Sequence, residues 1–112
     1  MGKGISRLQK SILRLLLDHG PLLRVRVILS QLFGWPGRPG DGQVFNRGVI
    51  GKEAYNSGHA SLSRSLARLQ ERGLVETYKN ATGYVTVIGL TTAGVAMARG
   101  IVEEDKNQRE RP

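Results

Sequence analysis

The stretch that constrains this chain most is residues 60–75, ASLSRSLARLQERGLV. Leu62, Leu66 and Leu69 recur at spacings of four and three, which places them on one side of an α-helix. Gly73 ends this helix, because glycine readily adopts the left-handed conformation of a C-terminal cap. The flank beside the leucines carries hydroxyl and guanidinium groups and no carboxylate: Ser61, Arg64, Ser65, Arg68 and Arg72.

A helix with an apolar seam and an arginine- and serine-rich flank is suited to binding duplex DNA. Arginine bridges O6 and N7 of guanine or binds phosphate, and serine can do either. An ordinary amphipathic helix with a solvated basic face would carry the same pattern. The helix by itself therefore leaves both interpretations open.

The residues that follow this helix carry a resemblance to a known family. SLSRSLARLQERGLVE, then a short polar turn and GLTTAG, resembles the recognition helix, wing and closing Leu-Thr-x-x-Gly of bacterial winged helix-turn-helix regulators, in particular the MarR-type group. The resemblance covers residues 60–98. It implies a mainly α fold with a small β-hairpin (α+β), in which a three-helix core is followed by a wing and a C-terminal helix.

Length and charge agree with a small basic domain. The 112 residues predict one domain over 1–102, followed by a charged tail over 103–112 that we expect to be frayed. Residues 1–102 carry 14 Lys/Arg against 5 Asp/Glu. This excess suits a polyanion such as nucleic acid, through phosphate neutralisation and counterion release. An anionic membrane surface, or solubility alone, would also account for the charge.

The same composition argues against other classes of protein. The chain has no cysteine and only two histidines, so we expect no disulfide, metal site or cofactor. No histidine has a clear acidic partner, and we do not expect an enzyme. No apolar run reaches the ~20 residues of a membrane span. Arg7, Lys10 and Arg14 interrupt the leucine-rich N-terminal segment, so we expect a cytoplasmic protein without a signal peptide.

The N-terminal third predicts two helices and a long insertion. Residues 6–19 have helical periodicity, with Ser6 as the cap. Residues 22–33 also predict a helix, although the alternation over 23–27 allows a short strand at its start. Residues 34–57 are rich in glycine and proline and depart from the family, because a helix-turn-helix normally joins its helices in 3–4 residues. This insertion is either functional or a mobile loop, with Trp35 stacked on a base or buried against the second helix.

The DNA-contacting helix is expected over 58–72, with Asn56 or Ser57 as its N-cap. A start near Lys52 is the alternative, and it would place Tyr55 and His59 on the first turns. Residues near this start are further candidates for DNA contact: Arg47, Lys52, Tyr55, Asn56 and His59.

The C-terminal third predicts a hairpin and a last helix. Strands over 74–78 and 84–90 flank a polar turn at 79–83. As the wing of the family it resembles, this turn would place Lys79, Asn80 and Thr82 against the DNA backbone or minor groove, although a plain hairpin is the alternative. Thr91 caps the last helix, which either completes the core or, as in the family, pairs two copies of the chain.

We therefore expect a sequence-specific double-stranded DNA-binding protein that acts as a transcriptional regulator. The expected partners are duplex DNA and a second copy of the chain, which would pair through the N- and C-terminal helices. Whether it responds to a small-molecule effector is left open. The alternative is a winged-helix module whose basic face serves RNA or protein–protein assembly, since a fold does not fix a function.

Overall fold

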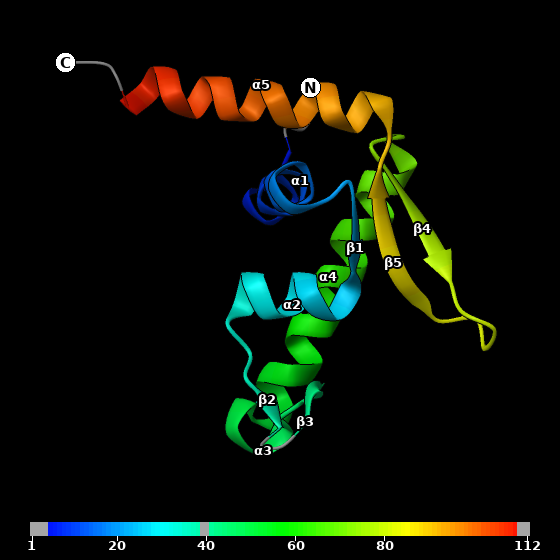
Figure 1. The fold of residues 1–112 in the computed structure, drawn as a ribbon. Coiled ribbons are helices and arrows are strands. Elements are labelled where there is room, and N and C mark those ends of the chain that lie inside the picture. The colour runs from blue at the N-terminus through cyan, green and yellow to red at the C-terminus, as the bar shows by residue number, and fades with distance from the viewer. Residues whose placement is uncertain (1–4, 39–40, 110–112) are drawn as a thin grey trace.

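Helices and a three-stranded antiparallel sheet enclose the core of the part that the computed structural model describes, residues 5–38 and 41–109 (Figure 1). The sheet has the order β1-β5-β4. The fold is therefore of the α+β class. The elements along the chain are α1 (Arg7–His19), β1 (Leu22–Arg24), α2 (Val25–Phe33), β2 (Gly37–Arg38), β3 (Asp41–Phe45), α3 (Arg47–Ile50), α4 (Lys52–Glu71), β4 (Val75–Lys79), β5 (Val85–Leu90) and α5 (Thr92–Arg109).

The first two helices follow the periodicity of the sequence. Ser6 caps α1, because its hydroxyl accepts a hydrogen bond from the Gln9 N–H at 3.2 Å. A short strand forms at the start of the segment 22–33, as the alternation over 23–27 allowed. This strand, β1, covers residues 22–24 and pairs with β5, with Leu23 opposite Ile88. Helix α2 begins only at Val25, so the prediction of a helix from residue 22 was wrong by three residues. It ends at Gly34, which has φ 67.

The insertion contains more regular structure than its glycines and prolines suggest. Between Phe33 and Lys52 the chain forms the small hairpin β2–β3 and the single-turn helix α3. Asn46 caps α3 through its side-chain oxygen, which accepts from the Val49 N–H at 3.3 Å. The predicted boundary at residue 57 was wrong, because residues 52–57 already belong to α4.

Helix α4 is a 20-residue helix, longer than the predicted 58–72. It begins after Gly51, whose φ of 94 sets the sharp change of direction from α3. The alternative start near Lys52 is therefore confirmed. Asn56 and Ser57 lie inside the helix, so neither is its N-cap. Arg72 is the C-cap, and Gly73 follows with φ 75.

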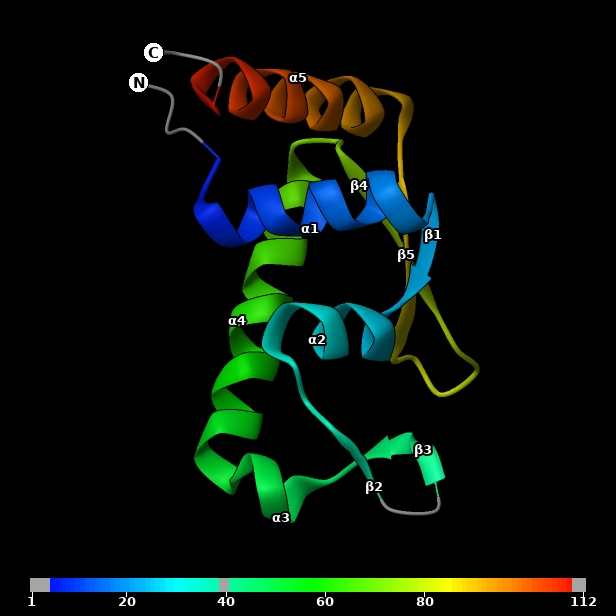
Figure 2. The same cartoon turned by 60° about the vertical axis from the view of Figure 1, so that its left-hand side comes forward.

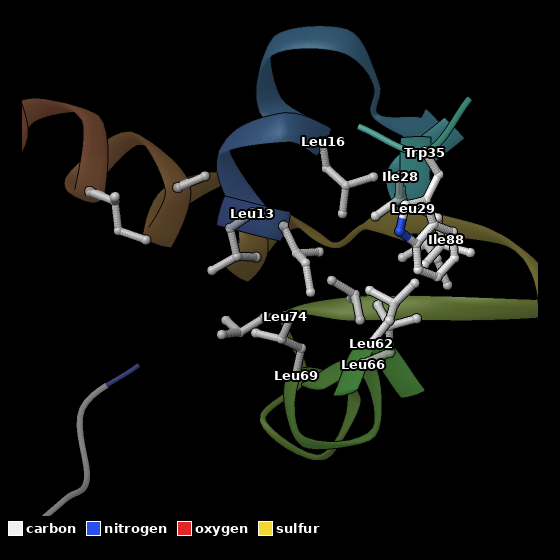
Figure 3. Close-up of a cluster of buried hydrophobic side chains, with 14 residues drawn as sticks. Leu13, Leu16, Ile28, Leu29, Trp35, Leu62, Leu66, Leu69, Leu74 and Ile88 are labelled. Carbon is white, nitrogen blue, oxygen red and sulfur yellow. The ribbon is translucent and has the colours of Figure 1, made fainter. Parts of the chain in front are cut away.

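The core lies where α1, α2, α4 and the sheet meet (Figure 3). The three leucines of α4 that the periodicity singled out are all buried. They pack in one cluster with buried side chains of α1, α2, α5 and the sheet. The largest fully buried side chains are Ile12, Leu13, Leu16, Ile28, Leu29, Leu62, Leu69, Val75 and Ile88.

Helix α5 lies across the end of the molecule against α1 (Figures 1 and 2). The Thr91 hydroxyl accepts from the Gly94 N–H at 3.0 Å and caps the helix as predicted. Gly94 lets the helix approach β4 closely, because a Cβ there would lie 2.0 Å from the Leu74 carbonyl oxygen.

The expectation of a frayed tail was wrong over residues 103–109, since α5 continues to Arg109, and the remainder of that tail, 110–112, lies outside the described residues. A salt bridge from Arg14 Nη1 to Asp105 Oδ2, at 2.6 Å, ties this part of α5 to α1. No helix in the described ranges is long and apolar enough to cross a membrane.

Candidate nucleic-acid interface

Helix α4 and the β4–β5 hairpin extend toward the same end of the molecule, away from α5 (Figures 1 and 2). One side of α4 packs into the core through Gly58, Leu62, Ser65, Leu66 and Leu69. The opposite side is exposed along the length of the helix. At about 100° per residue, the exposed residues nearest the centre of this outer face are Glu53, Asn56, Ser57, Ala60, Arg64, Ala67 and Glu71.

Small side chains dominate the outer face of α4 in its middle turns. Ser57, Ala60 and Ala67 are exposed and short, and Ser63 lies at the edge of the face. Arg64 is the one long side chain in these turns, so the helix backbone on either side of it can approach the floor of a groove. The sequence analysis missed Ala60, which has no polar group, and Ser63, which lies outside the predicted flank. The signal that could have found them is their position opposite the leucine seam.

The predicted basic flank lies toward the start of α1. Ser61, Arg64, Ser65 and Arg68 line a shallow hollow of about 290 Å³ together with Ser6, Leu8 and Gln9 of the α1 end. Arg64 and Arg68 are exposed there, and Ser61 is half-buried. Arg72 is exposed at the C-terminal end of α4, more than a turn from the centre of the helix. The two arginines of the hollow therefore lie at the boundary between the outer face and α1.

Ser65 corrects the predicted set, because only 8% of its surface is exposed. The leucine spacing placed it on the open flank. The buried stripe is wider on that side, since Gly58 also packs inward and a Cβ there would lie 2.5 Å from Trp35 Cζ2. Adding Gly58 to the leucines shifts the centre of the buried stripe toward Ser65. Ser65 is therefore less accessible to a duplex than its exposed neighbours Arg64 and Arg68.

The hairpin tip is organised by Asn80. Its Oδ1 accepts hydrogen bonds from the Thr82 N–H at 3.0 Å, the Thr82 hydroxyl at 2.8 Å and the Tyr84 N–H at 3.0 Å. Two of the predicted contact residues are thus bonded to each other, and the Asn80 oxygen shapes the turn. Lys79 is exposed at the end of β4, and Tyr84 is 71% exposed at the same tip.

The five further candidates around the start of α4 divide into two groups. Arg47, Lys52 and Asn56 are exposed and line a hollow at the α3–α4 corner. Tyr55 and His59 are half-buried and belong to a cluster of rings around Trp35. We call this group the aromatic cluster; its members are Phe33, Trp35, Phe45, Tyr55 and His59.

The aromatic cluster anchors the insertion to α4. Trp35 is 8% exposed and stacks on Tyr55 with ring centroids 5.1 Å apart. The Arg47 guanidinium lies 4.5 Å from the centroid of the same Tyr55 ring. Burial, and then the charge of Arg47, lower the pKa of His59 below its ordinary value of 6.5. Trp35 is therefore buried, which was one of the two alternatives for it, but it packs mainly against α4, and its ring contact with the second helix is to Phe33 at the end of that helix.

The exposed surface of α4 and the hairpin tip is mainly cationic. Arg64, Arg68 and Lys79 flank an outer face whose acids, Glu53 and Glu71, lie near the two ends of the helix. Within residues 5–38 and 41–109, no group of three or more His, Cys, Asp or Glu side chains is arranged to hold a metal ion. These cations can neutralise phosphates on both sides of α4, whose middle turns carry mostly short side chains.

Comparisons with known proteins found no match: no family model, no curated protein and no solved structure matches this chain.

Proposed function

We propose that the chain is a sequence-specific double-stranded DNA-binding protein of the winged helix-turn-helix type, acting as a transcriptional regulator. The observation that carries the proposal is that the N-terminal half of α4 and the β4–β5 tip extend from the core in the same direction, away from α5 (Figures 1 and 2). A 20-residue helix with an open, small-residue outer face extends toward the same end as the hairpin (Figure 2). When β2, β3 and α3 of the insertion are left out, the order from α1 to β5 is helix–strand–helix–helix–strand–strand, with β5 between β1 and β4, which supports the winged-helix assignment.

In this proposal the outer face of α4 enters the major groove. Asn56, Ser57 and Ser63 contact base edges, and the alanines allow close approach. Arg64 reaches a base edge or phosphate, while Arg68 and Lys79 bind phosphates on either side. Relative to the flank predicted from sequence, the contact surface is turned away from Ser61 and Ser65 and toward Asn56 and Ser63.

A second copy of the chain would complete the regulator. The surface that would pair is a groove of about 670 Å³ along α5, with Met97 37% exposed beside Ala93, Ala96 and Gly100. Lys10 and Glu104 also line this groove, so two copies related by a two-fold axis can bring opposite charges together. Sedimentation analysis of the Met97→Glu variant tests this pairing: we expect a dimer to dissociate, and a monomeric parent chain would overturn it.

The decisive experiment is a fluorescence titration with mixed-sequence duplex DNA, single-stranded DNA and duplex RNA at two salt concentrations. We expect duplex DNA to bind best, with an affinity that falls steeply with salt because bound counterions are released. The Arg64→Ala/Arg68→Ala variant should reduce the slope of log Kd against log salt by about 2.

The matched control is Arg99→Ala/Lys106→Ala, which removes two exposed cations from α5. If net charge alone determined binding, both double variants would lose the same affinity, and the proposed docking would be wrong. Absence of duplex binding at low salt would overturn the regulator. A preference for RNA would favour the alternative, a winged-helix module that uses its basic face elsewhere.

A further inference from the structure

The hollow of about 290 Å³ between the start of α1 and one side of α4 is cationic. Arg64 and Arg68, one turn apart on α4, are exposed and both line it. No carboxylate side chain is among the described residues of its lining. An anionic group that enters the hollow therefore meets two guanidinium groups and no like charge.

Two polar side chains in the wall of this hollow are buried and unused. Gln9 is 7% exposed and Ser65 is 8% exposed, and both line the hollow. Within residues 5–38 and 41–109, neither the Gln9 amide nor the Ser65 hydroxyl forms a hydrogen bond. Polar groups at this depth normally have a partner, so the pair points to a hydrogen-bonding group that enters the hollow. A phosphate, with three acceptor oxygens and a charge near −2, matches these donors and the two guanidinium groups.

Ser6 is the residue of this lining that can carry such a phosphate. Its side chain is exposed, and its Oγ caps α1 by accepting a hydrogen bond from the Gln9 N–H at 3.2 Å. The first turn of α1 contains no acidic residue, and Arg7 and Lys10 lie there. A phosphate on Ser6 would therefore lie at the positive end of the α1 dipole, where a negative charge is favoured, and beside the arginines of α4.

We propose that Ser6 is a phosphorylation site whose phosphate occupies the hollow, binds Arg64 and Arg68, and releases the chain from duplex DNA. Release follows because the two arginines assigned to the duplex are then paired with the phosphate, whose charge also repels the DNA backbone. The release rests on the proposed function, whereas the occupation of the hollow does not.

The modification is a phosphoryl transfer from a nucleoside triphosphate, catalysed by a serine protein kinase. A bond forms between Ser6 Oγ and the γ-phosphorus, and the bond from that phosphorus to its bridging oxygen breaks. The nucleoside diphosphate leaves with the electron pair of the broken bond, and the hydroxyl proton passes to a carboxylate base of the kinase. Ser6 is accessible to such an enzyme because it is exposed and precedes the first helix.

The first test uses the full chain with phosphoserine encoded at position 6, followed by phosphorus NMR in the absence of DNA. The second pKa of phosphoserine is ordinarily about 6. We expect the pKa of the phosphate to lie about 0.5–1 lower in the folded chain than in the same chain unfolded in urea, because opposite charges favour the dianion. Arg64→Ala/Arg68→Ala should lose most of this difference, and the control Arg99→Ala/Lys106→Ala should keep it. An equal phosphate pKa in the folded parent and in Arg64→Ala/Arg68→Ala would overturn the occupation of the hollow.

The second test is a titration of the phosphorylated and unmodified chains with duplex DNA. Phosphorylation should weaken binding about tenfold and reduce the slope of log Kd against log salt by about 2. Ser6→Asp and Ser6→Asn form a matched pair, since both side chains cap a helix and only aspartate carries a charge. We expect Ser6→Asp to weaken binding about threefold and Ser6→Asn to bind as the parent does.

The outcomes separate this proposal from the proposed function. Equal affinity of the phosphorylated chain and an unmodified chain that binds DNA would overturn the release, as would equal weakening by phosphorylation and by Ser6→Asn. If the unmodified chain does not bind duplex DNA, the proposed function fails and the release fails with it, while the NMR result still decides the occupation of the hollow. Mass spectrometry of the chain from the cells that produce it should find phosphate on Ser6. An N-terminal peptide without phosphate at that serine would overturn the modification site.

Discussion

The two halves of α4 are held to the molecule by different chemistry. The C-terminal half is anchored by Leu62, Leu66 and Leu69, which pack with aliphatic side chains of α1, α2 and the sheet. The N-terminal half is anchored by rings, with Trp35 of the insertion lying against Gly58 and stacked on Tyr55. Trp35 belongs to the same buried cluster as the leucines, but this second anchor is supplied by a segment of the insertion.

This difference implies that the N-terminal half of α4 unfolds locally at a lower free energy than the C-terminal half. Elements with few apolar contacts open locally at lower free energy than the core does. Without the aromatic cluster, residues 52–57 would project from the core as an isolated end of helix, which is marginal in water. The insertion therefore stabilises the first turns of α4, which carry Asn56 and Ser57 of the proposed interface.

The largest effect should come from the aliphatic anchor. Leu69 is 0% exposed, so Leu69→Ala leaves a cavity and should lower the free energy of unfolding by about 3–5 kcal/mol. Urea unfolding measures this loss. The control is Met97→Ala, at a side chain that is 37% exposed, which should lose much less. Equal losses at the two positions would contradict the assignment of the core.

The aromatic anchor should show a smaller and more local effect. Trp35→Ala should cost about 2–4 kcal/mol, because Trp35 is 8% exposed where Leu69 is 0% exposed, so part of the space it leaves is open to water. Hydrogen exchange should show the amides of residues 52–60 losing protection while those of residues 62–71 keep theirs. Uniform loss along the whole helix would mean that α4 opens as one unit and that its halves are not separable.

A pair of glycines sharpens the comparison further. Gly58→Ala places a methyl group 2.5 Å from the Trp35 ring, and the flanking rings leave Trp35 little freedom to shift. We expect a loss of about 1–3 kcal/mol despite the better helix propensity of alanine. Gly100→Ala in α5 meets no atom within 4 Å and should stabilise by up to about 1 kcal/mol. Thermal unfolding of the two variants should therefore shift in opposite directions.

The same contrast explains what could be predicted from the sequence. The leucine seam, the cap at Ser6 and the hairpin follow from local periodicity and capping, and each was predicted within a residue or two. The start of α4 near Lys52 was predicted only as an alternative, because local signals also allowed a cap at Asn56 or Ser57. The burial of Ser65 could not be predicted in this way, since it lies beside Ser6, Leu8 and Gln9, which are more than 50 residues away along the chain.

The candidate site was predictable to the same extent. Arg64, Arg68 and Lys79 are exposed, as their charges suggest. Asn80 and Thr82 bond to each other because a short polar side chain in a tight turn finds backbone and hydroxyl donors nearby. The groove that Arg24, Phe45 and His59 line has walls from five separate elements, β1, α2, β3, α4 and β5, and spacing along a chain carries no information about such a meeting.

The smallest effect should be a pH dependence that originates in the aromatic half. Burial, and then the charge of Arg47, lower the pKa of His59 in the folded chain, while in the unfolded chain it returns to about 6.5. The unfolded state therefore binds the proton more readily, and stability falls as pH drops from about 6.5 through the folded value.

This contribution should be absent from His59→Phe, which keeps the ring and cannot be protonated. Urea unfolding at intervals from about pH 7.5 to 5.5, above the range where most carboxylates titrate, should show a shallower decline for the variant. His19 is present in both proteins, so it cancels in the difference. Parallel declines would mean that protonation of His59 costs the folded state nothing, and that the rings around it tolerate a charge.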